Sequence, residues 1–272
     1  MPEKKLNSVD AVKVSVRILD SLALAQRAMG VTELAEQLNE TKPRIHRHLG
    51  TLKEVGLIEQ DSATERYRLG WRMFQLGEAA GNQFDLRRRA EPYMVQLRDE
   101  LHETVVLTVA TNGMPMVIST IDNIYARICV SVKPGNRPPP NRSALGRVSL
   151  AFASPREHAS MLDELRASGV RLDQAALASL SQRLEQIRAN YYEICSGEMM
   201  TGISTLAVPI FRDGALLAGA LAIVGSVDDI PVPANERQIK ALQRVARELS
   251  EQLNSTMYSE RVRIPARRRA AS

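Results

Sequence analysis

Apolar residues near the N-terminus recur with the spacing of short α-helices. In residues 9–28, the positions that follow this spacing are Val12, Val16, Leu19, Leu22 and Leu24. Gly30 ends the segment, and the next apolar pair, Leu34 and Leu38, stands four residues apart and can share one buried face. The pattern predicts a first helix over residues 9–28 and a short second helix after Gly30.

A third helix is predicted directly after the tight polar connection Asn39-Glu40. Its apolar stripe has i, i+4, i+7 spacing and consists of Ile45, Leu49 and Leu52. Thr41 is the candidate N-cap, and Pro43 fits the first turn, where backbone N–H groups lack helical partners.

The face opposite this stripe is basic. The segment 41–53 contains no acid and four cations, Lys42, Arg44, Arg47 and Lys53. At about 100° per residue, Arg44, Arg47 and Thr51 lie away from the buried stripe. A basic helix preceded by a short helix suits insertion into the DNA major groove, whereas the plain alternative is a solvated helix in a helical domain.

Two β-prone pieces follow, residues 57–59 and 66–69, around the polar turn 61–64. Three helices and then a hairpin is the order of a winged helix-turn-helix. In that arrangement Arg66 and Arg68 on the wing would contact phosphates and fix the register on DNA.

The second half of the chain changes to mixed β and α patterns. Residues 71–80 and 84–104 still read as helices, the latter as a link between two domains. Strands are predicted at 105–110, 116–120, 126–132, 191–195, 203–211 and 215–225, with a hairpin turn at Asn112-Gly113. Helices are predicted from Ser143 onward and at about 155–168, 173–190 and 235–254. Helices that flank a mostly antiparallel sheet define an α+β fold.

Composition narrows the class of protein. The chain has 272 residues, of which 44% are hydrophobic and 25% charged, as in a soluble protein of two domains. Its net charge of +5 suits a polyanionic partner, while only 4% aromatic residues disfavour stacking on single-stranded bases. The N-terminus has no signal-like apolar region and no stretch is apolar enough to span a bilayer, so we expect a cytoplasmic protein that does not bind membranes.

Candidate enzyme and metal chemistry is weak. His46 and His48 point about 200° apart on a helix and cannot chelate one ion together. Cys129 and Cys195 are far apart with no CxxC, which argues against a structural zinc site. Cys195 is either a nucleophile or redox sensor or, as we favour, a small thiol of a pocket or core. We expect no metal, no cofactor and no enzymatic activity.

Four segments, in order, carry a family pattern: SVRILDSLA; VTELAEQL followed by KPRIHRHLGTLKEVGLIEQD and RYRLGWRMFQLG; KPGNRPPPNRSALGRVSLAF; and GISTLAVPIFRDGALLAGALAIVGS. Through them the chain resembles the IclR-type bacterial transcriptional regulators along nearly its whole length. The resemblance implies a winged helix-turn-helix over residues 1–81, a linker helix at 82–102, a GAF-like effector-binding and oligomerisation domain at 103–255 and a basic, disordered tail at 256–272.

The resemblance also implies a homodimer or tetramer that binds double-stranded operator DNA and responds to a small metabolite, often a carboxylate. The expected DNA-binding residues are Thr41, Lys42, Arg44, His46, Arg47, Thr51, Arg66 and Arg68. The runner-up function is a small-molecule-binding module or an enzyme with a purely structural helix-turn-helix.

The resemblance places the effector against the concave face of the sheet. The start of the following helix, Ser143, Ala144, Leu145 and Gly146, would lie beside it, where a helix N-terminus offers free N–H donors to an anion. The walls would come from Cys195, Thr205, Ala222 and Val224. Members that bind small polar acids carry an acid and two serines where this chain has Cys195, Ala222 and Val224. The less polar set favours a more apolar acid, aromatic acids included.

Overall fold

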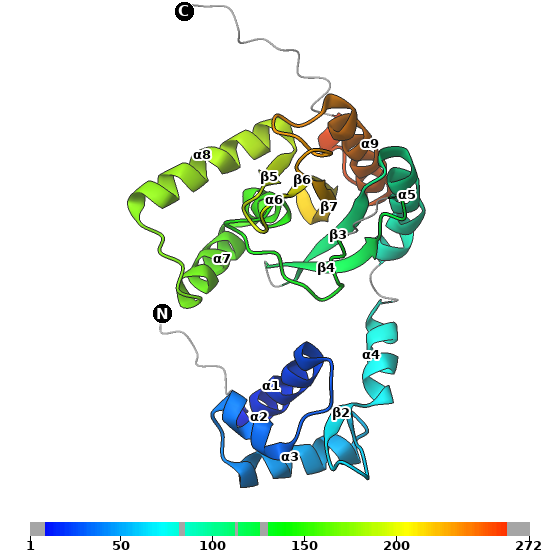
Figure 1. Cartoon of the computed structure of the whole chain (residues 1–272). Coiled ribbons are helices and arrows are strands. Elements are labelled where there is room, and N and C mark those ends of the chain that lie inside the picture. The colour runs from blue at the N-terminus through cyan, green and yellow to red at the C-terminus, as the bar shows by residue number, and fades with distance from the viewer. Residues whose placement is uncertain (1–8, 82–84, 112–113, 126–129, 260–272) are drawn as a thin grey trace, which may run out of the picture. The chain divides into compact units, whose positions relative to one another are not determined.

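The computed structural model describes residues 9–81, 85–111, 114–125 and 130–259 (Figure 1). The chain divides into two compact units, Met1–Phe84 and Asp85–Ser272, which are described separately. The Asn112-Gly113 turn, Cys129, part of the strand predicted at 126–132 and most of the basic tail lie outside the described residues.

The first unit is a winged helix-turn-helix, as predicted. Its elements are α1 (Asp10–Ala25), α2 (Val31–Leu38), α3 (Lys42–Glu54), β1 (Ile58–Gln60), β2 (Tyr67–Leu69) and α4 (Trp71–Gly81). The antiparallel strands β1 and β2 form the wing. The core joins α1, α2 and α3 through fully buried side chains that include Ile18, Leu34, Ile45 and Leu49.

The buried face of α1 differs from the apolar pattern of the sequence. Val12 and Leu24 are 59% and 81% exposed, and Val16 is exposed as well. The core contacts of α1 come from Val14, Ile18 and Leu22, which are spaced by four residues, and from the partly buried Leu19; only Leu19 and Leu22 of these belong to the predicted pattern. Val12 and Val14 point about 200° apart on a helix, so only one of the two apolar sets can face α3.

The second unit is an α+β domain built on one antiparallel sheet of order β4-β3-β7-β6-β5. The strands are β3 (Thr104–Thr111), β4 (Met114–Ile121), β5 (Glu193–Ser196), β6 (Ile203–Arg212) and β7 (Leu216–Ser226). The helices are α5 (Asp85–Leu101), α6 (Ala144–Phe152), α7 (Pro155–Ala167), α8 (Gln174–Asn190) and α9 (Glu236–Gln252).

Helices cover both faces of this sheet, and each face has its own core (Figure 1). The helices α5 and α9 pack on one face, with Met94 of α5 and Leu242 of α9 fully buried. The helices α6, α7 and α8 pack on the other, where Val106 and Ala222 of the sheet meet Val148 of α6. Because β residues alternate between faces, the same strands supply both cores.

Residues 130–132, the described end of the strand predicted at 126–132, form no strand. Pro134 and Gly135 lie in a turn, and Gly135 takes a left-handed φ of 91°. The remaining strands and helices of this unit fall within a few residues of their predicted positions.

Candidate functional site

The outward face of α3 carries three basic side chains that have no partner in the described part of the chain. Lys42, His46 and Arg47 are exposed, and their side chains make no hydrogen bond or ion pair with the part of the chain that the structure describes. Ile45, Leu49 and Leu52 on the opposite side are buried. The packing of α3 therefore leaves these side chains free to meet an external ligand.

Arg44, also predicted to face DNA, is placed differently. Its guanidinium pairs with the carboxylate of Asp10 and lies 3.2 Å from Glu40 Oε2. Arg17 of α1 also reaches Glu40, at 3.2 Å, and donates to the carbonyl of Leu38. These contacts tie the start of α3 to α1 and to the turn after α2.

The wing arginines are likewise paired with acids. Arg66 Nη1 donates to Ala28 O at 3.2 Å and lies 3.4 Å from a Glu33 carboxylate oxygen. Arg68 lies 3.1 Å from Glu59 on the neighbouring strand. DNA phosphates would have to compete with these carboxylates.

Thr41 occupies the N-cap position of α3 with an extended backbone, but its side chain makes no capping hydrogen bond. The Thr51 hydroxyl donates to Arg47 O at 3.3 Å. His48 lies 2.9 Å from Ser15 Oγ of α1, while His46 points outward. His48 therefore contacts α1, whereas His46 is exposed on the outward face of α3.

In the second unit, Ser143 caps α6. Its hydroxyl accepts from Gly146 N at 3.0 Å and donates to Pro139 O at 2.8 Å. A Cβ at Gly146 would lie 2.3 Å from Pro139 O, so only glycine fits this close approach. The N–H groups of Ala144 and Leu145 have no partner among the described residues, as expected for a first helical turn.

The predicted wall residues share the sheet face that α6 covers. Cys195, Thr205 and Val224 are register neighbours across β5, β6 and β7, and Ala222 lies two residues from Val224. Cys195, Ala222 and Val224 belong to the same buried cluster as Ala144 and Leu145 of α6. The structure thus brings the predicted effector-site residues together.

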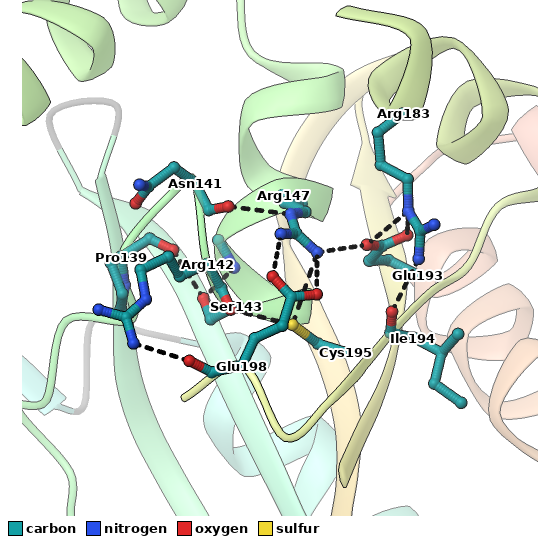
Figure 2. A network of polar contacts seen from close by, with 11 residues as sticks. Pro139, Asn141, Arg142, Ser143, Arg147, Arg183, Glu193, Ile194, Cys195 and Glu198 are labelled. Atoms are coloured by element: carbon teal, nitrogen blue, oxygen red, sulfur yellow. Dashed lines mark hydrogen bonds and ion pairs between the residues drawn. The ribbon is translucent and has the colours of Figure 1, made fainter. Parts of the chain in front are cut away.

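Sequence reasoning missed the charged group beside them, which Figure 2 shows. Arg147 of α6 donates to Glu193 at 3.0 Å, to Glu198 at 2.9 Å and to Asn141 O at 3.0 Å. A second contact from its Nη2 makes the pairing with Glu198 bidentate. Arg183 Nε of α8 donates to both carboxylate oxygens of Glu193, at 3.0 and 2.9 Å, and so shares Oε1 with Arg147.

Glu193 and Glu198 differ in exposure. The Glu193 side chain is 4% exposed, and burial raises the pKa of its carboxyl despite the two arginines. Glu198 is 40% exposed; desolvation acts to raise the pKa of its carboxyl, but hydrogen bonds from Arg147 outweigh this and lower it. Arg142 donates to the backbone oxygen of Glu198 at 2.7 Å. A buried acid and an outer acid therefore hold the same guanidinium.

Cys195 lies inside this group. Its Sγ donates to Arg142 O at 2.9 Å and accepts from Arg147 at 3.5 Å. Burial raises the pKa of the thiol to about 12, so it stays protonated at neutral pH. Because the thiolate is the reactive form, this geometry favours a pocket thiol over a nucleophile or redox sensor.

Among the described residues, no three His, Cys, Asp or Glu side chains come close enough to hold a metal ion. No helix in those same segments is long and apolar enough to cross a membrane.

The first unit is a winged helix-turn-helix whose third helix exposes basic side chains. The second is an α+β domain with polar groups at the start of α6. Together they define the class of two-domain DNA-binding regulators. A model of the IclR helix-turn-helix domain matches residues 11–62, and a model of the C-terminal domain of the bacterial transcriptional regulator IclR matches residues 79–251. The chain belongs to the IclR family of transcriptional regulators.

Individual relatives agree with this assignment. Over 259 residues the chain is 30% identical to the HTH-type transcriptional regulator KdgR of Escherichia coli K12, covering 94% of this chain and 97% of KdgR. The crystal structure of an IclR transcriptional regulator from Alicyclobacillus acidocaldarius matches with a TM-score of 0.75 at 25% identity, covering 90% of this chain and 98% of that chain. An IclR homologue from Microbacterium hydrocarbonoxydans, crystallised with 4-hydroxybenzoate, matches with a TM-score of 0.75 at 20% identity, covering 90% and 99%, and has the same fold.

Proposed function

We propose that the protein binds operator DNA as a homodimer or tetramer, with α3 in the major groove and the wing on phosphates. The observation that carries this proposal is the outward face of α3, where Lys42, His46 and Arg47 are exposed and unpaired within the described chain. Guanidinium groups on a major-groove helix can bind guanine edges bidentately. This function places the protein in the cytoplasm and requires no catalysis.

The effector in this proposal is an organic acid that binds between the start of α6 and the sheet. The N–H groups of Ala144 and Leu145, which have no partner among the described residues, would donate to its carboxylate, and Cys195, Ala222 and Val224 would contact its apolar part. An effector that binds one arrangement of the second unit better than another shifts the population of DNA-competent protein.

Sequencing of genomic fragments retained by the purified protein tests the DNA part. We expect fragments that share an inverted repeat, with half-sites about one helical turn apart or a multiple of it. An Arg44→Ala, Arg47→Ala double variant should lose them. Absence of specific fragments at low salt would contradict the proposal, because phosphate contacts are strongest there.

Calorimetry on the full-length protein tests the effector part. We expect 4-hydroxybenzoate to bind more tightly than glyoxylate or pyruvate, because the wall residues Ala222 and Val224 offer no polar group to a small oxoacid. Tighter binding of the two- or three-carbon oxoacids would show that the apolar-acid assignment is wrong.

A further inference from the structure

A cavity of about 520 Å³ lies beside α8, and Arg147 and Glu198 are among the residues that line it. Val170, Leu172 and Leu180 supply apolar lining. None of the residues expected at the sheet-face effector site, from Ser143–Gly146 to Val224, lines this cavity. Cavities of about 300–1,000 Å³ accommodate small organic ligands. The space is therefore a second candidate site, separate from the first.

One mostly polar face of α8 forms a wall of the cavity. Ala176, Ser179, Arg183 and Gln186 recur every three or four residues and all line the cavity. Residues at this spacing lie on the same side of a helix. Leu184 and Ile187, on the buried side, anchor α8 to the rest of the unit. Packing of the opposite side of α8 therefore fixes the position of its cavity-lining face.

The charge of the lining favours an anion. Three arginines, Arg147, Arg171 and Arg183, line the cavity, against one carboxylate, Glu198. Arg171 is exposed and its side chain has no partner among the described residues. Glu193 stands behind Arg147 and Arg183 and offsets part of their charge. Even with both acids ionised, arginines outnumber carboxylates.

One of the two carboxylates that pair with Arg147, that of Glu198, comes from an exposed turn. Glu198 lies in the connection between β5 and β6, which Gly197 and Gly202 flank with left-handed φ values of 73° and 81°. The Arg147 side chain is 12% exposed and keeps Glu193 and Asn141 O as partners if Glu198 leaves. The guanidinium is therefore pre-positioned for a replacement carboxylate.

We propose that this cavity binds a small organic carboxylate with an apolar part, anchored by Arg147 and Arg171, and that Glu198 is the internal counter-ion which the ligand carboxylate replaces. The proposal does not depend on which acid binds the sheet-face site. Since Arg147 also contacts Cys195, a ligand here would act on the same helix start that borders that site.

Isothermal titration calorimetry of the full-length protein, with benzoate and the uncharged benzamide as probes, tests the proposal. Glu198→Gln removes the competing carboxylate. It should lower the Kd of benzoate about tenfold relative to the unaltered protein. Benzamide binding should not change. Glu164→Gln, which removes the same charge from an exposed position of α7, is the matched control and should have no effect.

Ser179→Trp localises the effect. Ser179 is exposed on α8 and lines the cavity, so the indole fills the space without entering the core. In the Glu198→Gln background it should abolish the gain, and Arg171→Ala should reduce it several-fold. The proposal is overturned if Glu198→Gln leaves benzoate affinity unchanged, if no benzoate binding is seen in the millimolar range, or if Ser179→Trp has no effect. If no organic acid binds at the sheet-face site, Ser179→Trp should still weaken benzoate binding, so the two proposals can be told apart.

Discussion

The guanidinium of Arg44, at the start of α3, pairs with the carboxylate of Asp10, in the first turn of α1. Arg47, one turn later on the same helix, has no such partner in the described chain. The two arginines looked equivalent in the sequence, but α1 divides their roles. In the free protein Arg44 forms ion pairs with acids, whereas Arg47 can bind DNA without first losing an ion pair to the described chain.

Asp10→Asn should therefore strengthen operator binding. Without the Asp10 carboxylate, Arg44 keeps only Glu40 and is more available to DNA. Because the pair is largely exposed, we expect a gain of about two- to five-fold, measured by fluorescence anisotropy with labelled operator. Asp20→Asn removes the same charge from an exposed position of α1 that has no side-chain partner among the described residues, and so controls for the change in net charge. Equal gains in both variants would show that the pairing itself is unimportant.

Arg47→Ala should weaken operator binding without loss of stability. A guanidinium that reads a base contributes about 1–3 kcal/mol of discrimination, and one that binds a phosphate changes the slope of log K against log salt by about one. Anisotropy titrations at several salt concentrations distinguish these roles. The thermal midpoint should stay constant, since Arg47 has no internal partner among the described residues. Arg156→Ala, on α7, controls for net charge, and an equal loss there would refute a direct role for Arg47.

The sequence predicted the helix-turn-helix and the positions of most strands of the second unit because their signals are local. Ile45, Leu49 and Leu52 lie within two helical turns, and their spacing alone determines which face of α3 is buried. Spacing alone does not determine which face of α1 is buried. Val12 and Val14 are both apolar, and only packing against α3 selects between them.

The charged group around Arg147 could not be predicted for a different reason. Its partners Glu193 and Glu198 are 46 and 51 positions away in the chain and meet it only because α6 packs beside β5. The Arg44–Asp10 pair has the same origin, with 34 positions between its members. Pairings of this kind depend on tertiary structure, and no spacing rule in the sequence encodes them.

Gly146→Ala should disturb the start of α6, because its Cβ would lie 2.3 Å from Pro139 O and 2.7 Å from Ser143 Oγ. Either the loop before Ser143 or the helix must move, so we expect a loss of about 1–3 kcal/mol in the free energy of unfolding and weaker binding of organic acids. Gly77→Ala is the control, since nothing lies within 4 Å of its Cβ position in α4. That change should stabilise by up to about 1 kcal/mol, as alanine favours a helix. Urea titrations measure both, and equal stability of the two variants would contradict the close packing.

Glu103 should make the stability of the second unit depend on pH. Its side chain is buried beside Gly225, and desolvation, with a smaller effect from Asp229, raises its pKa from 4.5 to about 7. The unfolded chain ionises Glu103 at the lower pH, so the stability present below pH 4.5 decreases as pH rises and is lost by about pH 7. Glu103→Gln keeps the size of the side chain without the charge. It should raise the free energy of unfolding at pH 8 by on the order of 2 kcal/mol relative to its effect at pH 4.5. Urea titrations at both pH values check this, with Glu164→Gln as the exposed control. A Glu103→Gln effect of the same size at both pH values would mean that folding does not raise the pKa of Glu103.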